Sequence, residues 1–297
     1  SKMNLKPENV LVCSTGVIGQ QLPVEKIEAS VPVLVESLSK DGHVQAREAI
    51  MTTDTKYKEV AVEFELGGKV VHIGTMAKGS GMIHINMGTM LGFITTDCAI
   101  SKEMLNKALK ESVAGTYNCI SVDGDTSTND TLLLLANGMA ENKEITSEGE
   151  DYNTFLAALN EVNTKMARKI AGDGEGAEHL IECKITGASS VETARVLAKS
   201  VISSSLVKAA FFGKDANWGR IICAMGYSGA QFDPEKVDLF FESAAGKIQI
   251  AENGVALDFS EEKATEILSQ PVVIATADVK MGHVKATAWG CDLTHGY

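Results

Sequence analysis

The step from Gly88 to Thr89 places a threonine hydroxyl beside a glycine carbonyl, at the entry to an apolar stretch over residues 90–96. Attack of the hydroxyl on that carbonyl would give an ester, and hydrolysis would leave Thr89 as a new amino terminus. The freed amine, with an ordinary pKa of about 8, could act as general base for its own hydroxyl. Glycine keeps the carbonyl open to attack. The local residues alone favour a plainer alternative, a buried strand threonine after a glycine turn.

The rest of the sequence carries further motifs that change this balance. In chain order they occupy residues 14–19, 51–55, 77–82, 86–91, 122–131, 173–177 and 212–220. In these motifs the chain resembles the ornithine acetyltransferase family, the glutamate N-acetyltransferases of the arginine pathway. The matches span nearly the whole chain, and the string DGDTSTNDT together with the segment around Thr89 is the most specific part.

The resemblance implies that Thr89 is the nucleophile and the first residue of a β-chain released by autocleavage at Gly88–Thr89. Thr89 would take the acetyl group from N-acetylornithine and pass it to glutamate, and bifunctional members of the family also accept acetyl-CoA. Such chemistry needs no metal and no organic cofactor. A self-processing fold of the N-terminal-nucleophile type and a homo-oligomeric assembly of paired α and β chains are expected with it.

The resemblance also assigns roles to residues around the nucleophile. Thr15 and Gly16 match the pair that forms the oxyanion hole, where loss of one donor typically costs about 3 kcal/mol of transition-state stabilisation. Thr52 and Lys78 match substrate-contacting positions, and Lys78 could pair with a substrate carboxylate. Glu175 matches a further substrate position and could hold an amine. Without the resemblance, these residues would be interpreted as a turn, a solvated loop charge and a solvent-facing carboxylate.

Several positions depart from the family pattern. Gly88 stands where alanine is commoner, Ala216 where proline is commoner, and His84-Ile85 where a pair ending in proline is usual. Compared with the family, the chain is also expected to be truncated at both ends. The missing tail would contribute substrate contacts, so the pocket is expected to be incomplete.

Composition bounds the class of protein. Lys and Arg number 27 against 39 Asp and Glu, a net charge of -12, so nucleic acid is a poor partner. The six cysteines show no CxxC spacing, and we expect free thiols in a reducing cytoplasm. No apolar run is long enough to cross a membrane.

Other motifs lack the context that their chemistry needs. The glycines at 172, 174 and 176 follow a helical pattern rather than a strand, which disfavours a dinucleotide site. The chain contains no GxSxG sequence, so the usual serine hydrolase arrangement has no support. The histidines are scattered, so no metal site is expected. Asp123, Asp125 and Asp130 lack EF-hand spacing. They are interpreted as a polar turn before a helix at 131–137, or alternatively as part of the pocket lining.

Hydrophobic periodicity predicts the elements that must position these residues. Helices are predicted at 23–39, 101–113, 151–171, 191–203 and 260–268. Strands are predicted at 59–66, 69–77, 179–186, 220–227, 237–242, 247–251, 272–279 and 283–289. Gly67-Gly68 predicts a hairpin turn between the first two strands.

This mixture predicts an α+β fold with layered mixed or antiparallel sheets and helices on their faces. A polar stretch at 138–151 suggests two α+β regions, 1–140 with the cleavage site and 141–297. The acyltransferase is the favoured function. The alternatives are a self-processing amidase or aminopeptidase with the same nucleophile, and an inactive fragment.

Overall fold

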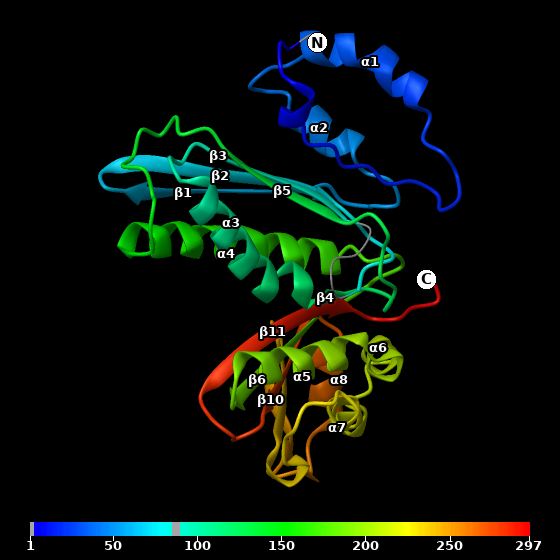
Figure 1. Cartoon of the computed structure of the whole chain (residues 1–297). Coiled ribbons are helices and arrows are strands. Elements are labelled where there is room, and N and C mark those ends of the chain that lie inside the picture. The colour runs from blue at the N-terminus through cyan, green and yellow to red at the C-terminus, as the bar shows by residue number, and fades with distance from the viewer. Residues whose placement is uncertain (1–2, 85–89) are drawn as a thin grey trace.

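The structure is a computed structural model that describes residues 3–84 and 90–297. It contains a four-stranded sheet and a seven-stranded sheet, each covered by helices (Figure 1). The predicted class, α+β with layered sheets and helices on their faces, is confirmed. None of the described helices combines the length and the apolar character that crossing a membrane requires.

The four-stranded sheet has the order β1-β2-β3-β5. Its strands are β1 (Lys58–Leu66), β2 (Lys69–Lys78), β3 (Leu91–Thr96) and β5 (Thr131–Ala136). β1 and β2 form the predicted hairpin through Gly67 and Gly68, whose φ angles of 56° and 77° suit glycine. β3 runs antiparallel to β2 and parallel to β5. The helices α3 (Lys102–Gly115) and α4 (Glu150–Ala171) cover one face of this sheet (Figure 1).

The seven-stranded sheet has the order β4-β11-β6-β10-β7-β8-β9. Its strands are β4 (Ile120–Ser121), β6 (Leu180–Ala188), β7 (Asp238–Ser243), β8 (Gly246–Glu252), β9 (Val255–Ala256), β10 (Val272–Asp278) and β11 (Val284–Cys291). The helices around it are α5 (Val191–Ser203), α6 (Ser205–Phe212), α7 (Trp218–Gly226) and α8 (Glu261–Leu268). Short 3-10 turns occupy η1 (Pro7–Asn9), η2 (Tyr117–Cys119) and η3 (Pro234–Lys236).

The helix α4 connects the two cores. Its first half buries Phe155 and Leu159 in the cluster beneath the four-stranded sheet, and its second half buries Met166 and Ile170 in the cluster of the seven-stranded sheet. One rigid helix therefore fixes the sheets relative to each other. The predicted division into regions 1–140 and 141–297 stays a prediction.

The first fifty residues pack differently from the rest. The helices α1 (Val24–Glu36) and α2 (His43–Ala49) bury no side chain. Both lie on the side of the four-stranded sheet opposite to α4 (Figure 1). Apolar side chains such as Val12, Ile18 and Leu34 are exposed there.

Two predicted elements are wrong. The predicted strand from Arg220 to Tyr227 is the helix α7, whose first turn is capped by the Asn217 side chain accepting from the Arg220 N–H at 3.2 Å. Its buried residues recur at helical spacing, and a short apolar run such as this one fits either structure. The predicted helix at 131–137 is the strand β5. Its leucines favour a helix intrinsically, but parallel pairing with β3 decides the outcome.

Candidate active site

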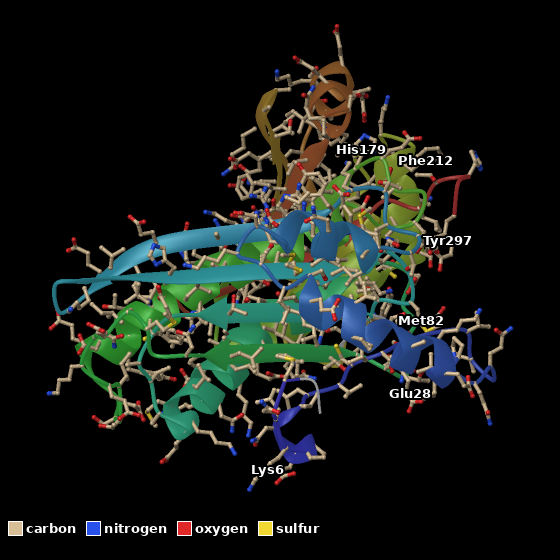
Figure 2. The ribbon with its side chains drawn as sticks, turned by 90° about the horizontal axis from the view of Figure 1, so that it is seen from above. Lys6, Glu28, Met82, His179, Phe212 and Tyr297 are labelled. Atoms are coloured by element: carbon tan, nitrogen blue, oxygen red, sulfur yellow. The ribbon has the colours of Figure 1, made fainter. Side chains whose placement is uncertain are left out.

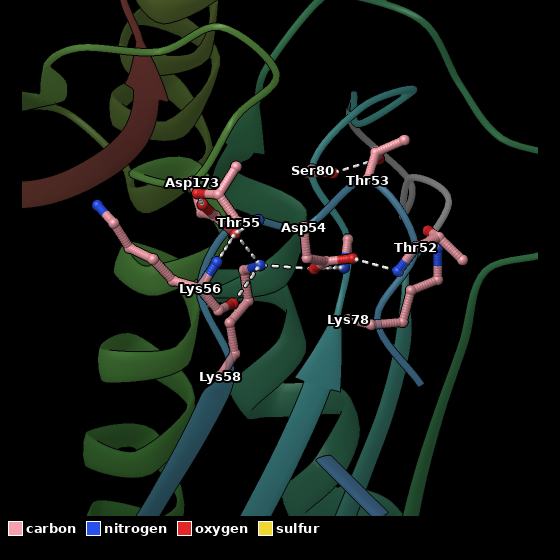
Figure 3. Close-up of polar contacts among 10 residues, drawn as sticks. Thr52, Thr53, Asp54, Thr55, Lys56, Lys58, Lys78, Ser80 and Asp173 are labelled. Atoms are coloured by element: carbon pink, nitrogen blue, oxygen red, sulfur yellow. Dashed lines mark hydrogen bonds and ion pairs between the residues drawn. The ribbon is translucent and has the colours of Figure 1, made fainter. Parts of the chain in front are cut away.

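A buried ion cluster joins three segments that carry the predicted site residues. The ammonium of Lys58, which is 1% exposed, lies 2.6 Å from Asp54 Oδ1 and 2.5 Å from Asp173 Oδ2. The Gly79 N–H donates to Asp54 at 2.7 Å, and the Thr55 N–H donates to Asp173 at 3.1 Å. The cluster therefore ties the loop before β1, the end of β2 and the turn after α4 together (Figure 3).

The ionisation of Asp54 follows from these contacts. Burial alone would raise the pKa of this carboxyl. Hydrogen bonds from the Gly79 N–H and from Lys58, together with the Lys58 charge, outweigh burial and lower the pKa of Asp54 below its usual value. Asp54 is thus an anion that holds both neighbouring segments, and not a proton donor.

Lys78, at the end of β2, is a buried cation with little compensation. It is 4% exposed, and its Nζ lies 3.4 Å from Thr52 Oγ1. Within the described part of the chain, Lys78 makes no ion pair. Burial lowers its pKa, while the charges of Asp54, Asp130 and Glu175 counteract that effect. A substrate carboxylate would supply the partner that Lys78 lacks.

Glu175 lies against the turn that follows Lys78. Its N–H donates to the carbonyl of Ser80 at 2.8 Å. Its carboxylate faces Gly81 so closely that a Cβ built on Gly81 would lie 2.5 Å from the carboxyl carbon. The adjoining hydroxyls of Ser80 and Thr53 are 2.6 Å apart. A side chain at position 81 would displace this carboxylate from its place, from which its charge acts on Lys78.

Two carboxylates of the DGDTSTNDT string hold the backbone on either side of residues 85–89. Asp123 accepts from the Met82 N–H and, at 3.0 Å, from the Ile83 N–H. Asp130 Oδ1 accepts from the Met90 N–H at 3.0 Å. The alternative that this string lines the pocket is therefore supported, although the helix expected to follow it is a strand.

Asp130, interpreted from the sequence as part of a polar turn or alternatively of the pocket lining, lies beside Met90 in the structure. Burial raises its pKa to about 6, against which the Met90 N–H and the Lys78 charge act. Its Oδ2 is buried and has no hydrogen-bond partner among the described residues. The parallel register, in which Leu91 lies opposite Thr131, brings Asp130 to this place. Recognition of β5 as a strand would have favoured the pocket lining over the polar turn.

An Asp130→Asn substitution is expected to change how stability depends on pH. The raised pKa means that Asp130 binds its proton more tightly in the folded protein than in the unfolded chain. The folded protein therefore loses stability as the pH rises from about 4 to about 6. Asparagine cannot titrate, but its oxygen can still accept from Met90. The difference in unfolding free energy, variant minus wild type, should therefore rise across this window in urea titrations. A difference that stays constant with pH would contradict this account of Asp130.

The remaining predicted site residues are Gly88, Thr89, Thr15 and Gly16. Gly88 and Thr89, the predicted cleavage site, lie outside the described residues. Thr15 and Gly16 belong to the N-terminal segment before α1, and within the described ranges no hydrogen bond joins them to Thr52 or Lys78. The structure thus brings Thr52, Lys78 and Glu175 together, while the oxyanion role of Thr15 and Gly16 stays a prediction.

The last residues of the chain reach the edge of the same site. Thr294 Oγ1 donates to the carbonyl of Gly176 at 2.6 Å. A Cβ on Gly176, whose φ is +69°, would lie 2.5 Å from the Gly296 carbonyl carbon. Figure 2 shows Tyr297 and Met82 on the same side of the molecule. The segment from Asp292 to Tyr297 therefore flanks the turn that carries Glu175.

One group in the described residues has the composition of a metal site. Possible ligand atoms of Glu178, His179 and Asp292 lie within 4.8 Å of one another. Asp292 already accepts from the N–H groups of Glu178 and His179 at 2.9 and 3.0 Å, and it lies 2.8 Å from His179 Nδ1. These bonds give Asp292 a structural role in anchoring the end of β11 to the start of β6.

Comparisons with known proteins place the chain in a family. The family model described as "ArgJ family" matches residues 1–297. Arginine biosynthesis bifunctional protein ArgJ 1 of Clostridium acetobutylicum is 55% identical over 295 residues, which are 99% of this chain and 72% of that protein. The ArgJ protein of Thermotoga neapolitana is 53% identical over 296 residues, covering 100% of this chain and 74% of that protein.

A solved structure agrees with the sequence matches. The crystal structure of the arginine biosynthesis bifunctional protein from Bacillus halodurans superposes with a TM-score of 0.66 at 43% identity. The match covers 69% of this chain and 95% of that chain. The family model, the relatives and the fold give one answer, so the chain belongs to the ArgJ family.

Proposed function

We propose that the chain is a glutamate N-acetyltransferase that moves an acetyl group from N-acetylornithine to glutamate through an acetyl-Thr89 ester. Autocleavage of the Gly88–Thr89 bond would first free the Thr89 amine. Membership of the ArgJ family supports this proposal, because relatives at 53–55% identity are named as bifunctional proteins of arginine biosynthesis. Acetyl-CoA as a second acetyl donor, a cytoplasmic location and an assembly of paired α and β chains are proposed on the same basis.

The observation that carries the proposal is the buried Lys78 ammonium, which has a hydroxyl but no carboxylate within ion-pair distance in the described chain. N-acetylornithine has a carboxylate for such a cation and a δ-ammonium for a nearby anion. The Glu175 carboxylate lies against the turn that follows Lys78, so opposite charges in the site match opposite charges in the substrate. Met90, the residue after Thr89, donates its N–H to Asp130 and so lies at the same edge of the sheet.

In the proposed reaction, the Thr89 amine takes the hydroxyl proton as the oxygen attacks the acetyl carbonyl. The amide C–N bond of N-acetylornithine then breaks, the proton passes to the leaving nitrogen, and ornithine departs. The glutamate amine attacks the ester next, which gives N-acetylglutamate and restores the hydroxyl. Thr15 and Gly16 are proposed as the donors to the oxyanion of both tetrahedral intermediates.

Intact-mass measurement tests the proposal directly. The purified protein should give two species, one ending at Gly88 and one beginning at Thr89. After incubation with N-acetylornithine, the second species should gain the mass of one acetyl group. Thr89→Ala is the control and should give one full-length species with no adduct.

The same measurement separates the alternatives. An adduct that glutamate discharges to N-acetylglutamate supports the transferase, since water alone should discharge it slowly. Rapid release of acetate without glutamate would indicate the amidase alternative. A single full-length species from the wild-type protein, with no adduct at saturating N-acetylornithine, would overturn the proposal and favour an inactive fragment.

A further inference from the structure

A cavity of about 550 Å³ lies away from Thr52, Lys78 and Glu175, none of which lines it. Its walls are one face of α5, the last turn of α3 with the following η2, the residues that follow α7, and His84. The α5 side chains recur at helical spacing, with Arg195 and Lys199 one turn apart. α5 itself packs on β11 and β6 and contacts α7 (Figure 1). The cavity is therefore built on rigid elements of the seven-stranded sheet.

The charged groups of two cations in this cavity have no hydrogen-bonded or ion-paired partner. Across residues 3–84 and 90–297, neither the Arg195 guanidinium nor the Lys199 ammonium makes a hydrogen bond or an ion pair, whereas the Lys199 carbonyl accepts from Ser203 Oγ at 2.7 Å. A Cβ on Gly115 would lie 3.0 Å from a terminal nitrogen of Arg195, so the absence of a side chain there makes room for the guanidinium. The guanidinium thus lies at the carboxyl end of α3, where the helix dipole favours a cation.

The remaining lining does not cancel this charge. Burial lowers the pKa of His84, and the Lys199 charge lowers it further, so His84 adds no third cation near neutral pH. His84 Nδ1 lies 2.9 Å from Ser121 Oγ, which leaves Nε2 for another partner. Glu192 is the one carboxylate among the described lining residues, and it is exposed in the first turn of α5. The cavity keeps a net positive charge in a chain whose net charge is -12.

We propose that this cavity binds a small anion with a carboxylate or phosphate group. The Arg195 guanidinium presents the forked donors that match either group in a bidentate pair, and Lys199 adds a point charge one turn further along α5. The cavity volume is within the range of small-molecule sites. An anion would also relieve the repulsion between two neighbouring, half-buried cations. Carboxylate and phosphate share this chemistry, so the experiment must separate them.

Isothermal titration calorimetry at constant ionic strength tests the site, with inorganic phosphate in one arm and succinate in the other. At least one anion should bind saturably to the wild-type protein. Arg195→Ala combined with Lys199→Ala should raise its Kd at least tenfold. Arg195→Lys, which keeps the charge but loses the fork, should weaken binding less and serves as the second variant if the double variant does not fold.

Two controls locate the binding. Lys110→Ala removes an exposed cation of α3 outside the cavity and should leave the Kd unchanged. Lys78→Met removes the cation of the candidate active site and should also leave it unchanged. Absence of binding in both arms would overturn the proposal. So would an unchanged Kd in the Arg195 and Lys199 variants, or loss of binding in Lys78→Met alone.

Discussion

Replacing Lys78 by methionine is expected to lower kcat/KM for N-acetylornithine by about 30-fold or more. The ammonium is buried and, among the described residues, has only the Thr52 hydroxyl at 3.4 Å as a partner, so the proposed substrate carboxylate is its main counter-ion. Removing one partner of a buried charge pair costs about 2–5 kcal/mol, and 2 kcal/mol corresponds to about 30-fold in rate. Steady-state kinetics with N-acetylornithine and glutamate measures the loss.

Stability separates this effect from misfolding. An unpaired buried cation costs desolvation energy in the free protein, so methionine of similar length should keep or raise the melting temperature. Lys69→Met, at the exposed start of the same strand, is the matched control and should keep kcat/KM within about twofold. An unchanged kcat/KM in Lys78→Met would mean that the substrate carboxylate binds elsewhere.

The sequence motifs could name the residues of the site but could not bring them together. Thr52 and Lys78 fall in separate motifs, and nothing in their spacing shows that the two side chains meet. The link is made by Lys58 and Asp173, which lie 115 positions apart along the chain. Lys58 in particular resembles any other charged residue at the start of a strand. Long-range pairing of buried charges depends on the packed fold, so local patterns do not reveal it.

The errors in the predicted elements have a related cause. Regular periodicity and turn residues were sufficient for the β1–β2 hairpin and for α5, where the local signal agrees with the tertiary packing. The leucines of β5 do not distinguish a helix from a strand, because a short apolar run fits either a helix or a buried strand. Pairing with β3 decides it, and the same pairing places Asp130 beside Met90. The predicted helix at 131–137 therefore left Asp130 open between a polar turn and the pocket lining.

Replacing Lys58 by methionine is expected to lower the free energy of unfolding by about 3–5 kcal/mol, the usual cost of removing one partner from a buried ion cluster. Asp54 and Asp173 would keep their backbone donors but lose the cation between them. The stability that the lowered pKa of Asp54 contributes is present above its unfolded pKa of about 4 and is lost as pH falls through the folded value. Urea unfolding at neutral pH measures the loss.

Lys56→Met is the matched control for this loss. Lys56 lies two residues away with an exposed side chain, and only its backbone N–H contacts Asp173, so its substitution should change stability by less than about 0.5 kcal/mol. Because the cluster holds the loop of Thr52 against the end of β2, Lys58→Met protein that stays folded should also lose acetyl transfer. A Lys58→Met variant as stable as Lys56→Met would mean that the backbone donors alone hold the two carboxylates.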